Sequence, residues 1–313
     1  MRVVFMGTPE FAVPSLKMLS QMDLELVGVF TQPDRPAGRG KKIEKSPAKL
    51  AAEALGIPVF QFEKGRRQEG LDCMRALKPD LIVTAAFGQI LSKKLLEVPR
   101  LGCINVHASL LPKHRGAAPI NWSIIMGEKV TGVTTMLTDV GLDTGDMLLM
   151  RPVRIGETET AGELTERLAL VGAELLKQTI EKYTAGAIVP EKQIESLMSY
   201  EPMLEKNTGL IDWSQSAETI SCLVRGVNPW PGAFTYLGGS VLKIWQARPA
   251  AGSGTPGEVI KASGKEGLFV ACGADALEIL ELQLPGGKRM SARAYLTGKK
   301  IEIGTVLGEA NVQ

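Results

Sequence analysis

Short apolar or β-branched segments alternate with helix-like patterns between the amino terminus and residue 185, and this alternation most constrains how the 313-residue chain can fold. Five segments have the length and composition of strands: Val3–Met6, Leu24–Phe30, Leu81–Ala85, Cys103–Val106 and Val133–Leu137. Strands separated by helices are typical of a mostly parallel sheet that helices cover on both faces. The pattern predicts a Rossmann-like α/β domain in this part of the chain.

Two helix starts can be read from the residues that cap them. Ser46 precedes Pro47, which combines an N-cap side chain with a proline at the first helical position. Thr160 and Glu163 form the capping-box pattern before an apolar periodic segment. We expect this second helix to close the first domain, which is predicted to span residues 1–189.

The chain changes character after this helix. Residues 190–206 lack a regular period and contain two prolines, which predicts a linker. From residue 207 on, we expect one helix at Ala217–Arg225 and several short strands. These strands are Val241–Trp245, Gly257–Ile260, Leu268–Ala271 and Leu277–Leu284. Short strands at this spacing favour a small OB-like β-barrel, so residues 207–313 are predicted to form a second domain.

Composition excludes several classes of protein. The formal net charge of +2 argues against a surface that coats nucleic acid throughout, although a local basic patch is compatible with it. The four cysteines are far apart and form no CxxC pair, which indicates reduced thiols, a cytoplasmic protein and no structural zinc. No apolar stretch reaches the ~18 residues of a membrane span, and the amino-terminal apolar run is too short for a signal peptide.

Both histidines of the chain, His107 and His114, lie within one short stretch. Imidazole is the side chain that titrates near neutral pH, so proton chemistry with it would have to occur here. Asn105 and His107 lie two residues apart at the end of an expected strand and therefore face the same way. In open α/β sheets the ligand crevice lies outside such strand ends, so the amide and the imidazole could meet a single oxygen. A histidine that only packs inside the domain is the alternative.

A second polar loop, Asp139–Gly145, follows another expected strand. Its glycines permit a tight backbone path that would bring Asp143 toward the same crevice. Two further segments are candidates for the crevice wall, Phe87–Leu91 and Ser109–Pro112, although each could equally be a buried connection. The crevice is therefore the expected location of any catalytic chemistry.

A short basic segment lies between residues 31 and 45. Its five cations are Arg35, Arg39, Lys41, Lys42 and Lys45, which are set against Asp34 and Glu44. Lysine and arginine on a flexible loop bind phosphates through a salt-dependent interaction that needs no rigid surface. A solvated charged loop without a ligand is the alternative.

Taken together, these motifs resemble a known family. The segments Asn105-x-His107, Ser109–Ile120 and Asp139–Gly145 are similar to those of the formyltransferases that use 10-formyltetrahydrofolate. Three other segments extend the resemblance nearly end to end and point to the members that act on methionyl-tRNA: Gly7–Ala12, Gln32–Lys42 and Arg225–Ala233. Lys113-His114 departs from the family pattern of a basic residue followed by an aromatic one. We therefore expect His114 to be a loop or packing residue without a role in proton transfer.

The resemblance implies a reaction. A formyl group would pass from 10-formyltetrahydrofolate, a co-substrate, to the α-amine of methionine on initiator methionyl-tRNA, without a metal. The resemblance implies that Asn105 and protonated His107 donate hydrogen bonds to the formyl oxygen, where negative charge develops. Asp143 would keep His107 charged and organise a water or proton relay.

The resemblance also implies binding residues. The folate contacts would be Phe87, Gly88, Gln89, Leu91, Ser109, Leu110, Leu111, Pro112 and Asp139. The tRNA contacts would be Arg35, Arg39, Lys41 and Lys42, while the second domain contacts the helix outside the acceptor stem. We expect tRNA to be the macromolecular partner, with neither DNA nor a membrane, and the protein to be a monomer.

Other functions fit parts of the sequence. The same Asn, His and Asp could formylate a nucleotide-linked amino sugar or glycinamide ribonucleotide, although the second domain argues against the latter. A nicotinamide-dependent oxidoreductase could use Asp34, but the Gly7–Ala12 turn lacks the GxGxxG pattern, with proline and alanine at positions 9 and 12. A catalytically silent folate- or RNA-binding module is a third alternative.

Overall fold

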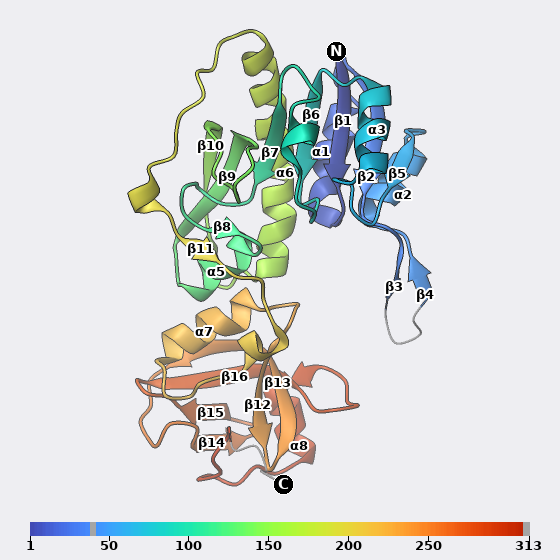
Figure 1. Cartoon of the computed structure of the whole chain (residues 1–313). Coiled ribbons are helices and arrows are strands. Elements are labelled where there is room, and N and C mark those ends of the chain that lie inside the picture. The colour runs from blue at the N-terminus through green and yellow to red at the C-terminus, as the bar shows by residue number, and fades with distance from the viewer. Residues whose placement is uncertain (38–41, 309–313) are drawn as a thin grey trace. The chain divides into compact units, whose positions relative to one another are not determined.

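The expected strands of the amino-terminal half pair into one seven-stranded sheet (Figure 1). The computed structural model describes residues 1–37 and 42–308, and the strand order is β10-β9-β7-β6-β1-β2-β5. The strands are β1 (Arg2–Gly7), β2 (Glu25–Thr31), β5 (Val59–Gln61), β6 (Leu81–Ala85), β7 (Cys103–His107), β9 (Val130–Leu137) and β10 (Met147–Arg154). All neighbours from β7 to β5 are parallel, whereas β9 runs antiparallel to both of its neighbours. The predicted mostly parallel sheet is confirmed.

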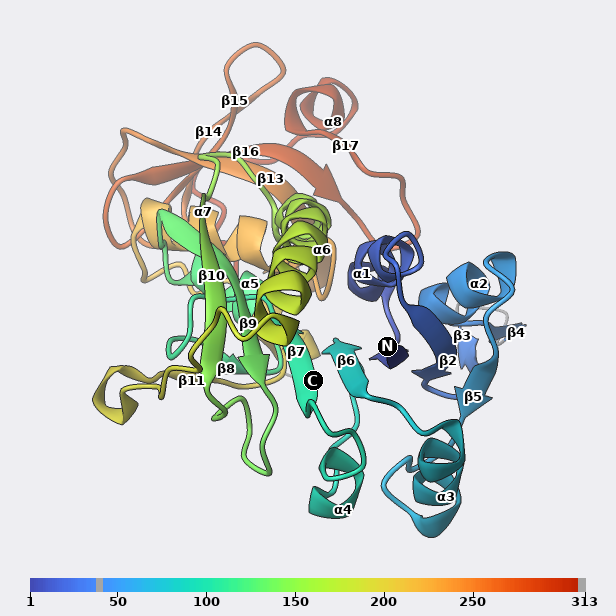
Figure 2. The ribbon, with the colours of Figure 1, turned by 90° about the horizontal axis from the view of Figure 1, so that it is seen from above.

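Helices cover both faces of this sheet, as Figure 2 shows. Their bounds are α1 (Val13–Leu19), α2 (Pro47–Ala54), α3 (Gln68–Leu77), α4 (Lys93–Leu96) and α6 (Ala161–Thr184). Helices α3 and α4 lie on one side, and α1, α2 and α6 lie on the other. Val3, Val4, Phe5 and Met6 are all fully buried, although successive side chains of a strand face opposite sides. Only a sheet covered on both faces can bury such a continuous apolar run.

Both predicted helix starts are confirmed. Helix α2 begins at Pro47, and the Ser46 hydroxyl accepts a hydrogen bond from the Lys49 backbone N–H at 3.1 Å. Helix α6 begins directly after Thr160, whose backbone N–H donates to the Glu163 carboxylate at 2.8 Å. These bonds satisfy N–H groups that have no partner within the helix itself.

The described chain divides into two compact units, each built from separated stretches. The first comprises residues 1–119, 130–154 and 165–201, and the second comprises 120–129, 155–164 and the described chain from 202 onward. The first unit also holds β3 (Arg35–Ala37), β4 (Lys42–Glu44), β8 (Arg115–Gly116), β11 (Tyr200–Glu201) and the 3₁₀ turns Glu10–Ala12 and Glu195–Leu197. Because β11 pairs with β8, the chain up to residue 201 contributes strand pairing to the first unit. The domain limits at residues 189 and 206 stay predictions.

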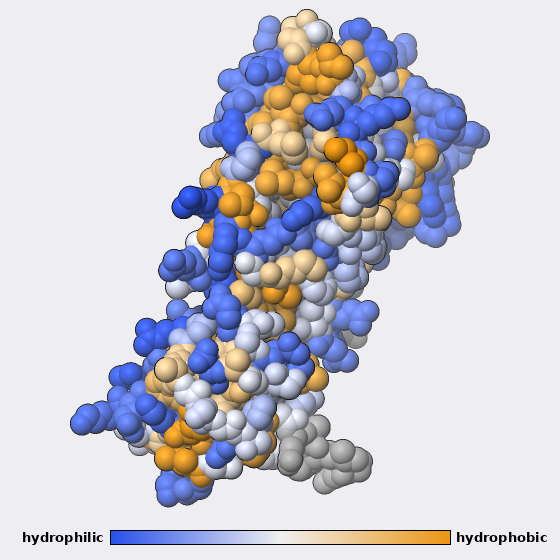
Figure 3. Space-filling model, turned by 90° about the vertical axis from the view of Figure 1, so that its left-hand side faces the viewer, coloured by the Kyte–Doolittle hydropathy of each residue, from blue (hydrophilic) through white to orange (hydrophobic). Residues whose placement is uncertain are grey.

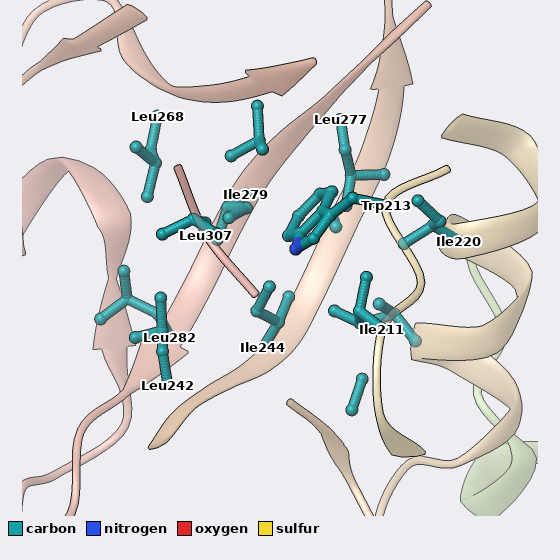
Figure 4. Close-up of a cluster of buried hydrophobic side chains, with 14 of the residues drawn as sticks. Ile211, Trp213, Ile220, Leu242, Ile244, Leu268, Leu277, Ile279, Leu282 and Leu307 are labelled. Atoms are coloured by element: carbon teal, nitrogen blue, oxygen red, sulfur yellow. The ribbon is translucent and has the colours of Figure 1, made fainter. Parts of the chain in front are cut away.

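An antiparallel sheet of order β12-β13-β16-β15-β14 forms the second unit, with β17 paired to β16. Its elements are β12 (Ala233–Leu237), β13 (Ser240–Ala250), β14 (Val259–Ser263), β15 (Gly267–Ala271), β16 (Ala276–Gln283), β17 (Met290–Ser291), α5 (Pro119–Ile125), α7 (Ala217–Gly226), α8 (Ala292–Gly298) and the 3₁₀ turn Lys206–Gly209. Figure 4 shows Trp213 in the core among Ile220, Ile244 and Leu277. Its indole N–H donates to Thr235 Oγ1 at 3.0 Å, which satisfies the one polar atom of the buried ring. The expected small β domain is thus an antiparallel sheet with a single apolar core.

Hydrophobic side chains gather on the upper part of the face shown in Figure 3 and are surrounded by hydrophilic ones. In the first unit, large exposed apolar side chains include several from the chain that follows α6. They are Val189, Ile194, Leu197, Met198 and Tyr200. Among the described residues, no helix combines the length and the apolar character needed to cross a bilayer.

Candidate active site

Thr84 and Asn105 lie side by side near the carboxyl ends of β6 and β7. The two residues are register partners, and Thr84 Oγ1 donates a hydrogen bond to Asn105 Oδ1 at 2.8 Å. Because this bond occupies the amide oxygen, Asn105 presents its amide nitrogen, a donor, in the other direction. Asn105 is half-buried, so this donor lies at the edge of the protein interior.

His107 is the last residue of β7 and is 5% exposed. Its Nε2 lies 3.0 Å from the backbone carbonyl oxygen of His114. A carbonyl oxygen can only accept, so Nε2 carries a proton and donates it to this bond. The remaining ring nitrogen, Nδ1, is therefore the atom through which His107 can act on a ligand.

Asp143 faces that second nitrogen. Its Oδ1 lies 3.7 Å from His107 Nδ1, which is an ion-pair distance but longer than a hydrogen bond. The other carboxylate oxygen accepts a hydrogen bond from the Gly116 backbone N–H at 2.9 Å. Asp143 has a φ of 53°, in the left-handed region that few residues other than glycine adopt. The structure thus brings His107 and Asp143 together from segments 36 residues apart.

The loop that carries Asp143 is a tight turn held by its own polar groups. Asp139 Oδ1 accepts hydrogen bonds from the Gly141 backbone N–H at 3.0 Å and from Thr144 Oγ1 at 2.7 Å. A Cβ atom at Gly145 would lie 1.7 Å from the carbonyl oxygen of Leu137, so only glycine fits there. This close approach lets the chain turn back into β10 directly beyond Asp143.

Comparison with known proteins assigns the chain to a family. A model described as formyl transferase matches residues 1–180, and one described as formyl transferase, C-terminal domain, matches residues 203–300. The chain belongs to the formyl transferase family. Methionyl-tRNA formyltransferase from Geotalea uraniireducens is 55% identical over 309 residues, covering 99% of this chain and 98% of that protein. The protein of the same name from Citrifermentans bemidjiense is 53% identical, with 99% and 97% covered.

Solved structures share the fold of this formyl transferase. The N-formyltransferase from Helicobacter canadensis in complex with folinic acid and dTDP-3-aminofucose superposes with a TM-score of 0.66. It is 18% identical, and the match covers 88% of this chain and 98% of that one. HypX from Aquifex aeolicus in complex with tetrahydrofolic acid gives a TM-score of 0.62 at 17% identity, covering 97% of this chain and 50% of that one. At these identities the likeness establishes the fold alone.

The predicted folate contacts of this formyl transferase differ in exposure. Phe87 is buried within a hydrophobic cluster, and Leu111 is buried against Met136 and Met147. The Gln89 amide is occupied within the protein, since it donates to the Phe62 carbonyl at 2.9 Å and accepts from the Gly65 N–H at 2.7 Å. Among the remaining contacts, Gly88 and Asp139 are exposed, Leu91, Leu110 and Pro112 are half-buried, and Ser109 is buried. These folate contacts stay predictions.

The basic segment begins and ends as a two-stranded hairpin, which projects from the sheet in Figure 1. Arg35 forms an exposed ion pair with Glu63 at 2.9 Å, and Lys42 is the first residue of β4. Arg39 and Lys41 lie outside the described residues. The predicted tRNA contacts in this hairpin stay predictions.

Asp34, at the base of the hairpin, is held by polar contacts. It binds Lys49 at 2.6 Å and the Gln61 amide at 2.7 Å. These two hydrogen bonds hold the pKa of the Asp34 carboxyl below its usual value. In the alternative oxidoreductase hypothesis Asp34 would bind a ribose. Here its carboxylate is paired with Lys49.

Several polar residues next to the proposed catalytic groups were not singled out from the sequence. They are Thr84, Gln193 and Glu201, together with Arg115, which the sequence offered only as part of a motif. No local pattern marks the first three, because each acquires its partner through contacts between distant segments. Within the described chain, no group of three or more metal-ligating side chains comes together. Cys103, at the start of β7, is a neutral thiol because burial raises its pKa to about 11.

Proposed function

We infer that this chain transfers a formyl group from 10-formyltetrahydrofolate to the α-amine of methionine on methionyl-tRNA, for the initiation of translation. The observation that carries the inference is the 55% identity to a methionyl-tRNA formyltransferase over 99% of the chain. That relative is itself covered to 98%, so both units of this chain have a counterpart in it. The donor is a co-substrate that is consumed in each turnover.

The reaction joins the amine nitrogen to the formyl carbon, breaks the bond from that carbon to the folate nitrogen, and moves a proton from amine to folate. Negative charge develops on the formyl oxygen as the amine attacks. We assign the Asn105 amide nitrogen as a donor to that oxygen. Thr84 holds the amide oxygen, and Nδ2 has no hydrogen-bond partner among residues 1–37 and 42–308. A fixed, unused donor of this kind suits a developing oxyanion.

We assign protonated His107 as the second donor. Its Nε2–H is occupied by the His114 carbonyl, so Nδ1–H is the bond available to the formyl oxygen. The 3.7 Å separation from Asp143 supports this role, because the carboxylate stabilises the charged ring without forming a direct hydrogen bond to Nδ1. Asp143 can also accept the proton of the attacking amine, directly or through water, for delivery to the folate nitrogen.

The basic hairpin and the second unit are the two parts of the chain that would bind the acceptor, methionyl-tRNA. We propose that Arg35, Arg39, Lys41 and Lys42 contact phosphates of the initiator tRNA, and that the second unit contacts the helix outside the acceptor stem. A-form RNA is read through its shape, backbone and 2′-hydroxyl groups, which suits flexible cationic side chains. We further propose that the protein acts as a monomer in the cytoplasm, without DNA or a membrane as partner.

An assay with competing acceptors tests the function. The purified protein is supplied with 10-formyltetrahydrofolate and with methionyl-tRNA, an amino-sugar nucleotide or glycinamide ribonucleotide. We expect rapid formylation of methionyl-tRNA alone. Turnover with one of the other acceptors, and none with methionyl-tRNA, would refute the proposal.

Alanine substitutions test the assigned roles. Replacing Asn105 is expected to slow single-turnover formylation by ~100- to 1000-fold, because one donor to the oxyanion is lost. We expect a similar loss for His107→Ala, which removes the second donor to the oxyanion. For Asp143→Ala we expect a loss of roughly 100- to 10,000-fold, the range typical of general acid–base groups. Gln178→Ala serves as the control, because this side chain is exposed and, among the described residues, hydrogen-bonds only to Arg151. A variant that keeps the wild-type rate removes that residue from the mechanism.

A further inference from the structure

The chain that follows α6 has an inverted burial pattern. Ile194 and Leu197 are each 57% exposed, whereas Gln193 is 9% and Glu201 is 2% exposed. Apolar side chains normally fill the interior, so a buried polar side chain between exposed apolar ones calls for a specific explanation. Such groups are buried because particular partners satisfy their hydrogen bonds. The partners of Gln193 therefore indicate what it does.

The Gln193 amide uses all of its hydrogen-bonding capacity. Its nitrogen donates to the carbonyl oxygens of Asp143 and Gly145, both at 2.8 Å. Its oxygen accepts from Arg115 Nε at 3.0 Å and Arg115 Nη2 at 2.9 Å. An amide has two N–H donors and two lone pairs on oxygen, and all four are engaged here. If the amide were turned by 180°, its nitrogen would face the N–H donors of Arg115 and its oxygen would face the two carbonyl acceptors. Only one orientation of the amide is therefore stable.

These bonds fasten the turn in which Asp143 sits. The left-handed φ of Asp143 is an uncommon conformation for a residue with a side chain and persists only where the surroundings enforce it. Gln193 binds the carbonyl of Asp143 itself and the carbonyl two residues later. The carboxylate is held by the Gly116 N–H, and Gly116 directly follows Arg115. Gly116 thus holds the Asp143 carboxylate directly, and Arg115 holds the Asp143 backbone through Gln193.

Arg115 anchors this arrangement to the chain that follows α6. Its side chain is 4% exposed and also pairs with Glu195 at 2.8 Å. This contact lowers the pKa of the Glu195 carboxyl. Arg115 thus binds two residues of the same segment, Gln193 and Glu195. Because both side chains bind one guanidinium, each has little freedom to change its orientation.

We propose that Gln193 is a positioning residue that holds Asp143 at the distance and orientation required for formyl transfer. The inference rests on the proposed function of the site. Gln193 acts through Asp143, because its amide is buried and its four bonding positions are occupied within the protein. Its loss should therefore lower the rate of the chemical step and leave substrate binding unchanged.

Two variants test the proposal in the full-length protein. Gln193→Met keeps the length of the side chain and removes all four hydrogen bonds, whereas Gln193→Glu keeps an acceptor for Arg115 and loses the donors to the turn. We expect both to lower the single-turnover rate by about 10- to 100-fold, since a misplacement of about 1 Å can cost that much. The KM values for methionyl-tRNA and 10-formyltetrahydrofolate should stay at wild-type levels. A wild-type rate per folded molecule in Gln193→Met would overturn the inference.

A double-mutant cycle shows whether Gln193 acts through Asp143. Residues that act as one unit have non-additive effects, so Gln193→Met should cause little further loss in an Asp143→Asn background. If the rate of the double variant instead falls by the product of the two single losses, Gln193 and Asp143 act independently and the proposal is overturned. An inactive wild-type protein would instead refute the proposed function itself.

Thr179→Val is the matched control for a general loss of stability. Thr179 is fully buried in the first unit and bonds to the Leu175 carbonyl at 2.7 Å and to Thr135 at 2.8 Å. Its replacement should lower the melting temperature without changing the rate per folded molecule. If the rate per folded molecule is also unchanged in Gln193→Met, the role of Gln193 is structural and the proposal fails.

Discussion

At the scale of single residues, one polar atom of each proposed oxyanion donor is engaged by the protein and the other is left for the substrate. Thr84 binds the Asn105 amide oxygen, and the His114 carbonyl binds Nε2 of His107. Each contact selects one orientation or tautomer of a side chain that otherwise has two. Preorganisation of this kind lets a donor meet developing charge without having to reorient during the reaction.

Replacing Thr84 should therefore impair the reaction through Asn105. Thr84→Val preserves the shape of the side chain but removes the hydroxyl, so the amide is free to turn its oxygen toward the substrate. We expect the single-turnover rate to fall by about 10- to 100-fold, less than the ~100- to 1000-fold expected when the donor itself is removed. Thr84→Ser keeps the hydroxyl and should retain most of the activity. Equal rates for the valine and serine variants would contradict this role of Thr84.

At the scale of elements, a very short strand pair holds the segment that contains His114. Strands β8 and β11 contain two residues each, and Arg115 N–H donates to the Ser199 carbonyl at 2.9 Å. Side chains reinforce the pair, since His114 Nδ1 lies 2.9 Å from Glu201 Oε1 and both residues are buried. Because the His114 carbonyl orients His107, the chain that follows α6 supports the imidazole as well as the Asp143 turn. That His114 takes no part in proton transfer stays a prediction.

Glu201→Leu should destabilise this pair. It deprives the buried His114 ring of an ionisable partner, and losing a hydrogen bond to a charged group costs about 1.5 to 3 kcal/mol. We expect a lower melting temperature and slower formylation, because the His114 carbonyl is less well fixed. The double variant His114→Leu and Glu201→Leu should regain part of the stability, since no imidazole is then buried without the carboxylate that it faces. Additive destabilisation of the two changes would argue against a direct interaction.

At the scale of the whole molecule, charge is nearly balanced. The chain has 36 lysines and arginines against 34 aspartates and glutamates, so its net charge gives little general attraction to RNA. Affinity for tRNA must then come from local concentrations of positive charge. The basic hairpin is the segment that the sequence marks most clearly for that role.

Neutralising the hairpin should change how tRNA binding depends on salt. We expect the triple variant Arg39→Ala, Lys41→Ala and Lys42→Ala to bind methionyl-tRNA more weakly. The slope of log affinity against log salt should become shallower by about 2 if each cation contacts one phosphate. The variant Lys78→Ala, Lys93→Ala and Lys94→Ala removes the same charge from the ends of α3 and α4 and should leave the slope nearly unchanged. Equal slopes for the hairpin variant and the wild type would mean that the hairpin is only solvated.

The sequence by itself determined the fold class, two helix starts and the residues nominated for catalysis. Strand and helix patterns are local, because they arise from the spacing of apolar and capping residues within a few positions. Asn105 and His107 could be nominated together because alternate residues of one strand share a face. The glycines of its loop and the family resemblance together predict that Asp143 lies in the catalytic site.

Tertiary structure decided how those residues are held. Gln193 meets Asp143 across 50 positions of the chain, and Glu201 meets His114 across 87. Such contacts depend on strand pairing and on the burial of particular polar atoms, for which neighbouring residues provide no signal. The tautomer of His107 and the orientation of the Asn105 amide follow from the same long-range contacts. Local periodicity could therefore specify the elements, whereas only packing between distant segments could specify the geometry of the site.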